Sequence, residues 1–434
     1  HKDQKLSVPI KPITFLISPE VPKKWRPYVK AGIEEWLSAF ESAGFKDALV
    51  VKEVDSLDEW TAHSIRSNIV HWPEKKYMRG SEYEDYGGTV ARIMDLGTGE
   101  ILRGDIFIGA SERTAMEKYF VRMAPLDKRA QQFPLPDEIV GAMFQVTTAH
   151  EAGHIFGLKD ANYGEYTYPW DKMNDSLWLR KMGYTPSIMN YTRPSNLPQP
   201  EDSIPPSLLV QKVGPADRYN IQWAYTEFPE ALSTEQESRA LEKMIRWQDS
   251  VPWYRFNNAI FETLGPGASN EVVETNDPVR STELALKNLE RVITLLPKVT
   301  EDQKDNAILG RLYEKTVELW YNHMVHVSTL IGGYDIHYKP LGQQGKMYTP
   351  IPWEKQSEAI DFLLVNAFNP PAWLIQPSFH SKTRFSTFPD KVMEYQQRLL
   401  PELILAPRLK RLEYMERSLA SESLIRTYLD ELQS

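Results

Sequence analysis

One stretch, from Thr147 to Asp160, restricts the possible folds more than any other part of the chain. It contains the pattern His-Glu-x-x-His-x-x-Gly-x-x-Asp, which begins at His150. Residues four apart lie on one face of a helix, so His150 and His154 can present two imidazoles to one metal ion. Glu151 lies beside them, where it can reach a water without binding the metal. The spacing predicts a helix with a zinc site that keeps one coordination position open.

The neighbours of this motif favour a buried helix. Apolar residues surround it, namely Phe144, Val146, Ala149, Ile155 and Phe156. Two bare imidazoles in such surroundings would be costly unless they bind a metal or accept hydrogen bonds. Gly157 follows where the helix would end, and a left-handed glycine there would turn the chain back towards the metal.

Composition narrows the class of protein and of metal ligand. The chain has 434 residues, enough for two or three domains, and a net charge of -9 that offers no basic surface for nucleic acid. It has no cysteine, so a metal must be held by histidines and carboxylates. No apolar run reaches 18 residues, so the sequence predicts no membrane-spanning helix.

Alternating strand and helix patterns precede the motif. Residues 12–17, 49–54 and 67–72 are short runs rich in β-forming residues, and a helical pattern covers 22–44. A strand, a long crossover helix and a second strand predict a parallel pair of strands with the helix on one face.

A hairpin and two helices are expected next. Residues 88–95 and 100–108 flank Leu96-Gly-Thr-Gly99, which predicts a turn rather than a calcium loop because the twelve-residue ligand spacing is absent. A helix should run from Ser111 to Met123, and Asp137 should be the N-cap of the helix that carries the motif.

The second half of the chain has a different character. From about residue 230 the pattern is helical, most clearly over 283–296 and 303–330, and three further amphipathic helices run to the C-terminus. We therefore expect an α+β catalytic domain over residues 8–228, with a mixed twisted sheet, followed by a mainly helical domain over 229–434.

A second motif connects the chain to a known family. Downstream of the first motif stands Ser187-Ile-Met-Asn-Tyr191, and the two together resemble the zinc signature and Met-turn of the metzincin metalloproteases. A looser resemblance, from about Pro9 to about Leu403, is to large, poorly characterised bacterial metzincin-like hydrolases. It implies bound Zn²⁺, further domains upstream in the same precursor, and an extracytoplasmic location in the periplasm, in the cell envelope or outside the cell.

The third zinc ligand departs from the commonest metzincin pattern. Most metzincins have a histidine where this chain has Asp160, although snapalysin-like enzymes are similar in having an aspartate. A set of two histidines and one carboxylate is chemically competent for catalysis. The alternative is that Asp160 is a surface or C-cap residue and that Glu165, Asp171 or Asp175 supplies the third ligand.

The resemblance also implies roles for individual residues. Glu151 would be the general base, and Met189 would form an apolar floor below the ligands. Tyr191 matches a position that ligates zinc or steadies the oxyanion in astacin- and serralysin-like enzymes; otherwise it is a core tyrosine. The strand from Glu100 to Ile108 is the candidate for binding an extended peptide, and the alternative is an internal strand without substrate contact.

Together these features predict a zinc metalloendopeptidase-like hydrolase that acts on a protein or peptide substrate. Two alternatives stay open, namely a zinc-binding pseudoenzyme that recognises its ligand without turnover, and an amidase acting on a small or cell-wall substrate. His323 and His326, three apart on a predicted helix, are expected to be packing residues and not a second metal site.

Overall fold

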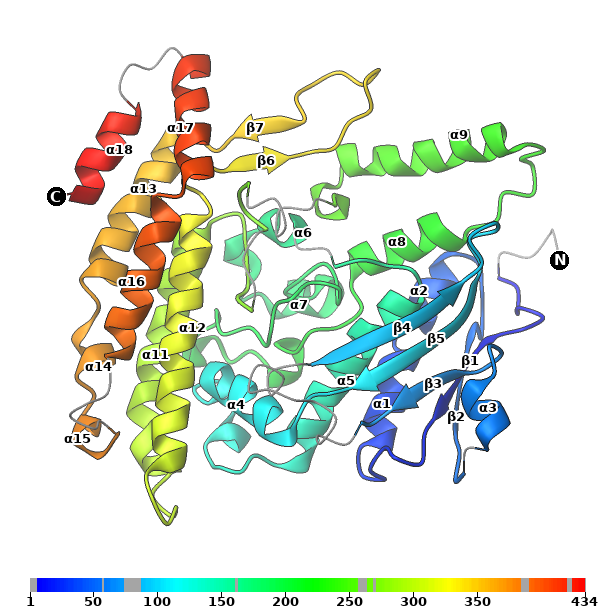
Figure 1. Cartoon of the computed structure of the whole chain (residues 1–434), viewed down its shortest axis with the longest axis horizontal. Coiled ribbons are helices and arrows are strands. Elements are labelled where there is room, and N and C mark those ends of the chain that lie inside the picture. The colour runs from blue at the N-terminus through cyan, green and yellow to red at the C-terminus, as the bar shows by residue number, and fades with distance from the viewer. Residues whose placement is uncertain are drawn as a thin grey trace.

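The computed structural model describes residues 6–56, 58–73, 87–160, 163–256, 264–267, 271–383, 390–419 and 424–433. A five-stranded sheet lies at one end of the molecule, and a layer of helices lies at the other (Figure 1). The strand order is β2-β1-β3-β5-β4. The strands are β1 (Ile13–Ile17), β2 (Leu49–Glu53), β3 (Asn68–His71), β4 (Gly88–Met94) and β5 (Ile101–Ile108).

The predicted parallel pair is confirmed, with a difference in the crossover. β1 and β2 are parallel, with Ile13 opposite Leu49. The helix expected over 22–44 is two helices, α1 (Arg26–Glu34) and α2 (Leu37–Ser42). Trp36 lies at the break, fully buried, and its indole Nε1–H donates to the Ala149 carbonyl at 2.8 Å. The break thus lets a large side chain brace the helix that carries the zinc motif.

The predicted hairpin is present, but the strand assigned to peptide binding is internal. β5 pairs with β3 in parallel and with β4 in antiparallel orientation, so both of its edges are used. β4 is the edge strand. In the turn, Asp95 accepts the Gly97 N–H at 2.9 Å and the Thr98 hydroxyl at 3.0 Å, which confirms the turn interpretation. Of the two alternatives for Glu100–Ile108, the structure therefore has the internal strand and not the peptide-binding edge strand.

The helix that carries the zinc motif is α5 (Asp137–Ile155), and it packs beside α1 on the sheet. Its N-cap is Pro136, not Asp137; Asp137 is the first helical residue, and its carboxylate lies 3.2 Å from Lys24 Nζ. Aromatic side chains fill the space between helices and sheet, where Phe156 packs edge-on against Phe15 and Phe40. This core fixes α5 relative to the sheet.

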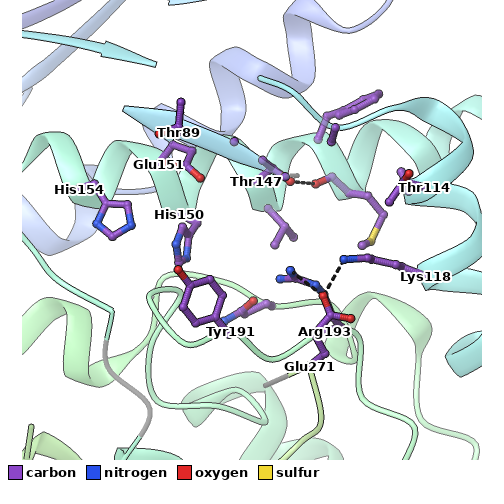
Figure 2. Close-up of a pocket in the computed structure, with 18 of the residues that line it drawn as sticks. Thr89, Thr114, Lys118, Thr147, His150, Glu151, His154, Tyr191, Arg193 and Glu271 are labelled. Atoms are coloured by element: carbon purple, nitrogen blue, oxygen red, sulfur yellow. Dashed lines mark hydrogen bonds and ion pairs between the residues drawn. The ribbon is translucent and has the colours of Figure 1, made fainter. Parts of the chain in front are cut away.

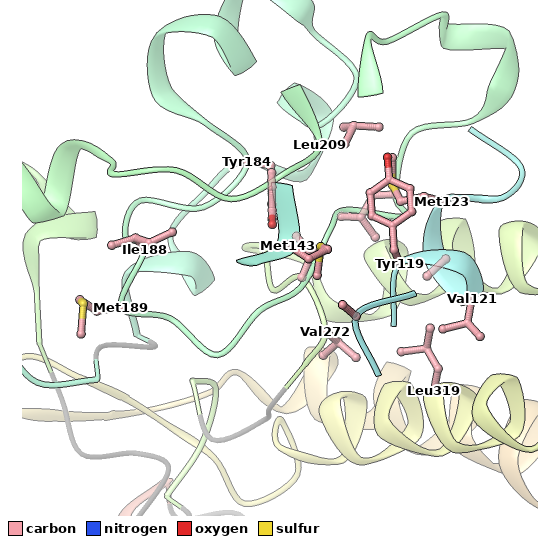
Figure 3. Packing of buried hydrophobic residues seen from close by; sticks show 14 of the residues in the cluster. Tyr119, Val121, Met123, Met143, Tyr184, Ile188, Met189, Leu209, Val272 and Leu319 are labelled. Carbon is pink, nitrogen blue, oxygen red and sulfur yellow. The ribbon is translucent and has the colours of Figure 1, made fainter. Parts of the chain in front are cut away.

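The second half of the chain is mainly helical, as predicted. The expected helices over 283–296 and 303–330 are α11 (Pro278–Val299) and α12 (Ala307–Ser328), and α12 packs against α4 (Glu112–Met123). Leu319 of α12 lies beside Val121 of α4 (Figure 3). A small hairpin joins β6 (Tyr334–Ile336) to β7 (Tyr348–Pro350).

The remaining α-helices are α3 (Glu59–His63), α6 (Tyr163–Tyr166), α7 (Ser176–Met182), α8 (Pro215–Tyr225), α9 (Thr234–Ile245), α13 (Trp353–Leu363), α14 (Ala372–Ile375), α15 (His380–Thr383), α16 (Lys391–Leu403), α17 (Ala406–Leu419) and α18 (Leu424–Gln433). The sheet with its covering helices and the helical second half confirm the α+β class. Across the described ranges, no helix combines the length and the apolar character needed to cross a bilayer.

Candidate metal centre

The two motif histidines extend from the last turns of α5, one helical turn apart. Their rings are 4.8 Å apart between centroids, and both are largely shielded from solvent. The helix ends directly after them, and Gly157 adopts a positive φ of 91° that an L side chain would strain. The chain therefore turns back past His154, as expected, and returns Asp160 to the imidazoles.

Backbone carbonyls set the orientation of both rings. His150 Nδ1 lies 2.9 Å from the carbonyl oxygen of Ile188, and His154 Nδ1 lies 2.9 Å from that of Leu158. A carbonyl oxygen can only accept, so each Nδ1 carries the ring hydrogen. Each Nε2 then keeps its lone pair, which is the arrangement of metal-binding histidines with a second-shell acceptor.

Asp160 completes a set of three ligand atoms. Its Oδ1 lies 3.3 Å from Nε2 of His150 and 3.3 Å from Nε2 of His154. Ligand atoms bound tetrahedrally to zinc at ordinary bond lengths are themselves about 3.3 Å apart. Oδ1 is buried and accepts no well-oriented hydrogen bond from the residues that the structure describes, as expected for an oxygen that faces a common point with the two nitrogens. The donor set and its spacing therefore fit a zinc ion.

The other candidate ligands lie elsewhere. Within the described ranges, only His150, His154 and Asp160 bring three metal-binding side-chain atoms within 4.8 Å of one another. Asp175 caps α7 by accepting the N–H groups of Leu177 and Trp178. Glu165 is buried beside Thr185 and Asn190. Asp171 lies in the short helical turn Trp170–Lys172.

Electrostatics distinguish the two carboxylates of the site. Burial would raise the pKa of Asp160, but the neighbouring imidazoles hold it well below its usual range. Burial also opposes charge on His154, yet the neighbouring Asp160 carboxylate and the Leu158 carbonyl raise its pKa overall. Burial raises the pKa of Glu151, more than the two imidazoles lower it. Asp160 is thus kept ionised as a ligand, whereas Glu151 is a stronger base than an exposed glutamate.

Tyr191 reaches the same centre. Its hydroxyl donates to Asp160 Oδ2 at 3.1 Å, and its ring lies 5.7 Å from that of His150 between centroids. Burial raises the pKa of Tyr191 to about 12, so the phenol stays protonated and able to donate. This hydrogen bond holds Oδ2 of Asp160 on the side of Tyr191, while Oδ1 faces the imidazoles.

The segment from Ser187 to Tyr191 lies directly below the two histidines. Met189 is fully buried and packs on α5 at Gly153; a Cβ atom there would lie 2.2 Å from the Met189 sulfur. Asp217 of α8 holds the segment by accepting the Ser187 hydroxyl at 2.5 Å and the Ile188 N–H at 2.7 Å. Since the Ile188 carbonyl orients His150, α8 acts on the ligand through this segment.

A cleft with a cavity of about 540 Å³ opens in front of the site and is bordered by the edge strand β4. Glu151 and both histidines face it, and Lys118, Arg193 and Glu271 lie at its opposite side (Figure 2). These three residues come from distant parts of the chain, and no local pattern in the sequence pointed to them. Asp217 carried a weak signal, because Gly214-Pro215 before it marks a helix start.

His323 and His326 are both buried on α12. Burial lowers the pKa of both, that of His326 to about 3, so they are neutral packing residues at ordinary pH. Neither belongs to a group of three metal-binding side chains within the described residues.

Comparison with known proteins gives one match. A family model described as Met-zincin matches residues 132–434, which include the zinc motif, the Ser187–Tyr191 segment and the helical half. No curated protein and no solved structure matches the chain. The family match covers well over half of the chain and agrees with the geometry of the site, so the chain belongs to the Met-zincin family, which implies zinc binding and a metallopeptidase-like role.

Proposed function

We propose that the protein is a zinc-dependent endopeptidase in which His150, His154 and Asp160 hold the metal. One observation carries the proposal: Nε2 of both histidines and Oδ1 of Asp160 converge at zinc-ligand spacing at the floor of an open cleft. A purely structural zinc needs no base, yet the carboxylate of Glu151 stands beside the ligands and lines that cleft.

Zinc bound there would supply Lewis-acid polarisation of the attacking water and of the scissile carbonyl. Glu151 accepts the proton of that water on its carboxylate and donates it to the leaving amine nitrogen. Burial suits it to both tasks, because a raised pKa makes the carboxylate a stronger base and keeps the carboxylic acid a usable donor.

Tyr191 has two tasks in this proposal. Its hydroxyl orients Asp160, and its protonated state also makes it a donor for the oxyanion of the tetrahedral intermediate. The Tyr191 side chain lines the cleft next to His150. On this proposal its hydroxyl donates first to Asp160 and then to an oxyanion formed in the cleft.

β4 is the strand that we propose binds the substrate backbone. It is the edge strand of the sheet, and Gly88, Thr89 and Val90 line the cleft. An extended peptide can add to such an edge through main-chain hydrogen bonds, which gives affinity with little dependence on sequence. The same edge would place the scissile bond near Glu151, whose side chain lies against Gly88.

Metal analysis combined with Glu151→Gln tests the function. We expect one zinc per chain in both proteins, and cleavage of unstructured protein substrates by the wild type only. Zinc without turnover of any protein or peptide would favour the recognition module, and turnover of small amides alone would favour the amidase. Absence of zinc would overturn all three. The extracytoplasmic location stays a prediction of the family resemblance, which cell fractionation would test.

A further inference from the structure

A cluster of charged side chains forms the wall of the cleft opposite the zinc ligands. Lys118 of α4 approaches Glu271 with its Nζ 2.6 Å from Oε1, and Arg193 approaches the same oxygen at 3.2 Å (Figure 2). Arg122, also on α4, lies 3.6 Å from Oε2. Three cations thus share a single carboxylate.

The cluster carries a surplus of positive charge. Lys118, Arg122 and Arg193 together with Glu271 sum to +2, and the three side chains that line the cleft, Lys118, Arg193 and Glu271, sum to +1. Although burial opposes ionisation, the three cations hold the pKa of Glu271 well below its usual range, so its charge is fixed. Two further acidic groups interact electrostatically with the cluster, Glu318 with Arg122 and Glu151 with Arg193.

The backbone of Glu271 is held in an unusual conformation. Its φ is +66°, a left-handed value that strains a non-glycine residue. Its N–H donates to the Tyr191 carbonyl at 3.1 Å, and its own carbonyl accepts from Arg122 at 2.8 Å. Such strain persists only where the surroundings enforce it, typically at functional sites.

The cleft has apolar lining as well as the cationic wall. Ala115, Met143 and Val146 line the cleft between α4 and α5, and Lys118 and Arg193 line its far side. Within the described ranges, Arg193 uses its two terminal nitrogens for one bond each, to the Thr192 carbonyl and to Glu271. A guanidinium has five N–H donors, so donors are left for a ligand.

We propose that this wall binds a carboxylate of the substrate, so that the enzyme selects peptides with an acidic residue close to the scissile bond. The inference rests on the proposed peptidase function and names its substrate class. A carboxylate of this kind comes from a glutamate or aspartate side chain or from the C-terminus of a peptide. Arg193 and Lys118 bind it through charge-assisted hydrogen bonds, and Glu271 limits their surplus charge while no substrate is present.

Peptide binding is measured on a variant that cannot cleave, so that the test of this inference does not depend on the proposed peptidase activity. The zinc-loaded Glu151→Gln variant is titrated with acetylated, amidated hexapeptides in which Glu or Gln occupies each position in turn. A third set carries Gln and a free C-terminus. We expect at least one position where Glu binds on the order of tenfold more tightly than Gln. Cleavage of the same peptides by the wild type should show the preference mainly in KM.

Variants of the wall and a matched control test whether the wall causes the preference for Glu over Gln. Lys118→Met should reduce the ratio of Glu to Gln affinities several-fold, and Glu271→Gln should increase it. Lys24→Met is the control, since Lys24 is a half-exposed lysine paired with Asp137 and Glu112 away from the cleft, and it should leave the ratio unchanged. If a wall variant does not fold, raised salt on the parent protein serves instead, because screening must weaken the preference.

Equal affinities for the Glu peptides, the Gln peptides and the peptides with a free C-terminus, or a preference that Lys118→Met leaves intact, would overturn the inference. A preference that depends on the free C-terminus supports the carboxylate site and assigns it to the chain end. Absence of cleavage in all peptides would refute the peptidase function alone, because the binding titration does not depend on turnover.

Discussion

Substitution of Asp217 tests most directly whether the segment from Ser187 to Tyr191 keeps His150 in place for zinc binding. Its carboxylate is fully buried and accepts N–H groups from Ile188 and Gly214, each at 2.7 Å. In Asp217→Ala both N–H groups lose their acceptor inside the protein, which costs about 1–3 kcal/mol each. Burial raises the pKa of Asp217 to about 6, so removal of its charge near neutral pH returns up to about 3 kcal/mol. The two losses together exceed or match this return, so we expect the free energy of unfolding to fall by up to about 3 kcal/mol.

Asp217→Ala should also weaken zinc binding. The Ile188 carbonyl accepts the Nδ1 hydrogen of His150, and Asp217 fixes the peptide of Ile188. Loss of such second-shell support weakens metal binding by about 10–100-fold. Urea unfolding measured by tryptophan fluorescence gives the stability, and competition with a chromophoric chelator gives the zinc dissociation constant.

Asp175→Ala is the matched control. Asp175 also accepts two backbone N–H groups, but at the exposed start of α7 and without contact with the histidines. Loss of an N-cap costs about 1 kcal/mol and should leave zinc affinity unchanged. If Asp217→Ala binds zinc as tightly as the wild type, α8 does not orient His150 through Ile188. If Asp175→Ala loses zinc, Asp175 is a ligand after all.

Three further changes give equally definite outcomes. Gly153→Ala would place a Cβ atom 2.2 Å from the Met189 sulfur and 2.7 Å from the Trp36 ring, so we expect about 1–3 kcal/mol of overpacking in thermal unfolding and weaker zinc binding. Asp160→Ala removes the third ligand and should weaken zinc binding, measured by the same chelator competition, more than Asp217→Ala does. Burial raises the pKa of Glu165 to about 8, so the stability that its protonated form contributes is complete below about pH 4.5 and is lost as the pH rises through 8. Glu165→Gln stays neutral, and its unfolding free energy should fall less than that of the wild type between about pH 5 and pH 9; parallel pH profiles of the two proteins would refute the assignment.

Local patterns gave the zinc helix, the β1 and β2 pair, and the turn at Leu96–Gly99, because spacing and glycine chemistry act within a few residues. The order of strands is a non-local property. The sequence of β5 fits an edge as well as an interior position, and only its pairing with both β3 and β4 decides between them. The break at Trp36 was equally hidden, since it serves a contact with Ala149 more than a hundred residues away.

The cationic wall shows the same limit for the site. Lys118 and Glu271 are 153 residues apart, and Arg193 and Glu271 are 78 residues apart. None of these three residues belongs to a motif. The sequence also does not indicate a positive φ at Glu271, because a glutamate rarely adopts one. Asp160, by contrast, could be assigned because Gly157 fixes the turn that returns it to the histidines.

The participation of Glu271 in the cleft has a consequence for biosynthesis. A ribosome completes the zinc motif at residue 160, and Glu271 is the 111th residue added after that. Lys118 and Arg122 on α4 also await α12, which packs against that helix. Chains grow from the N-terminus and fold as their parts emerge. A nascent or prematurely terminated chain therefore has the residues that we propose bind zinc before it has the wall that we propose selects substrates. On this proposal, full discrimination arises only when synthesis has passed α12.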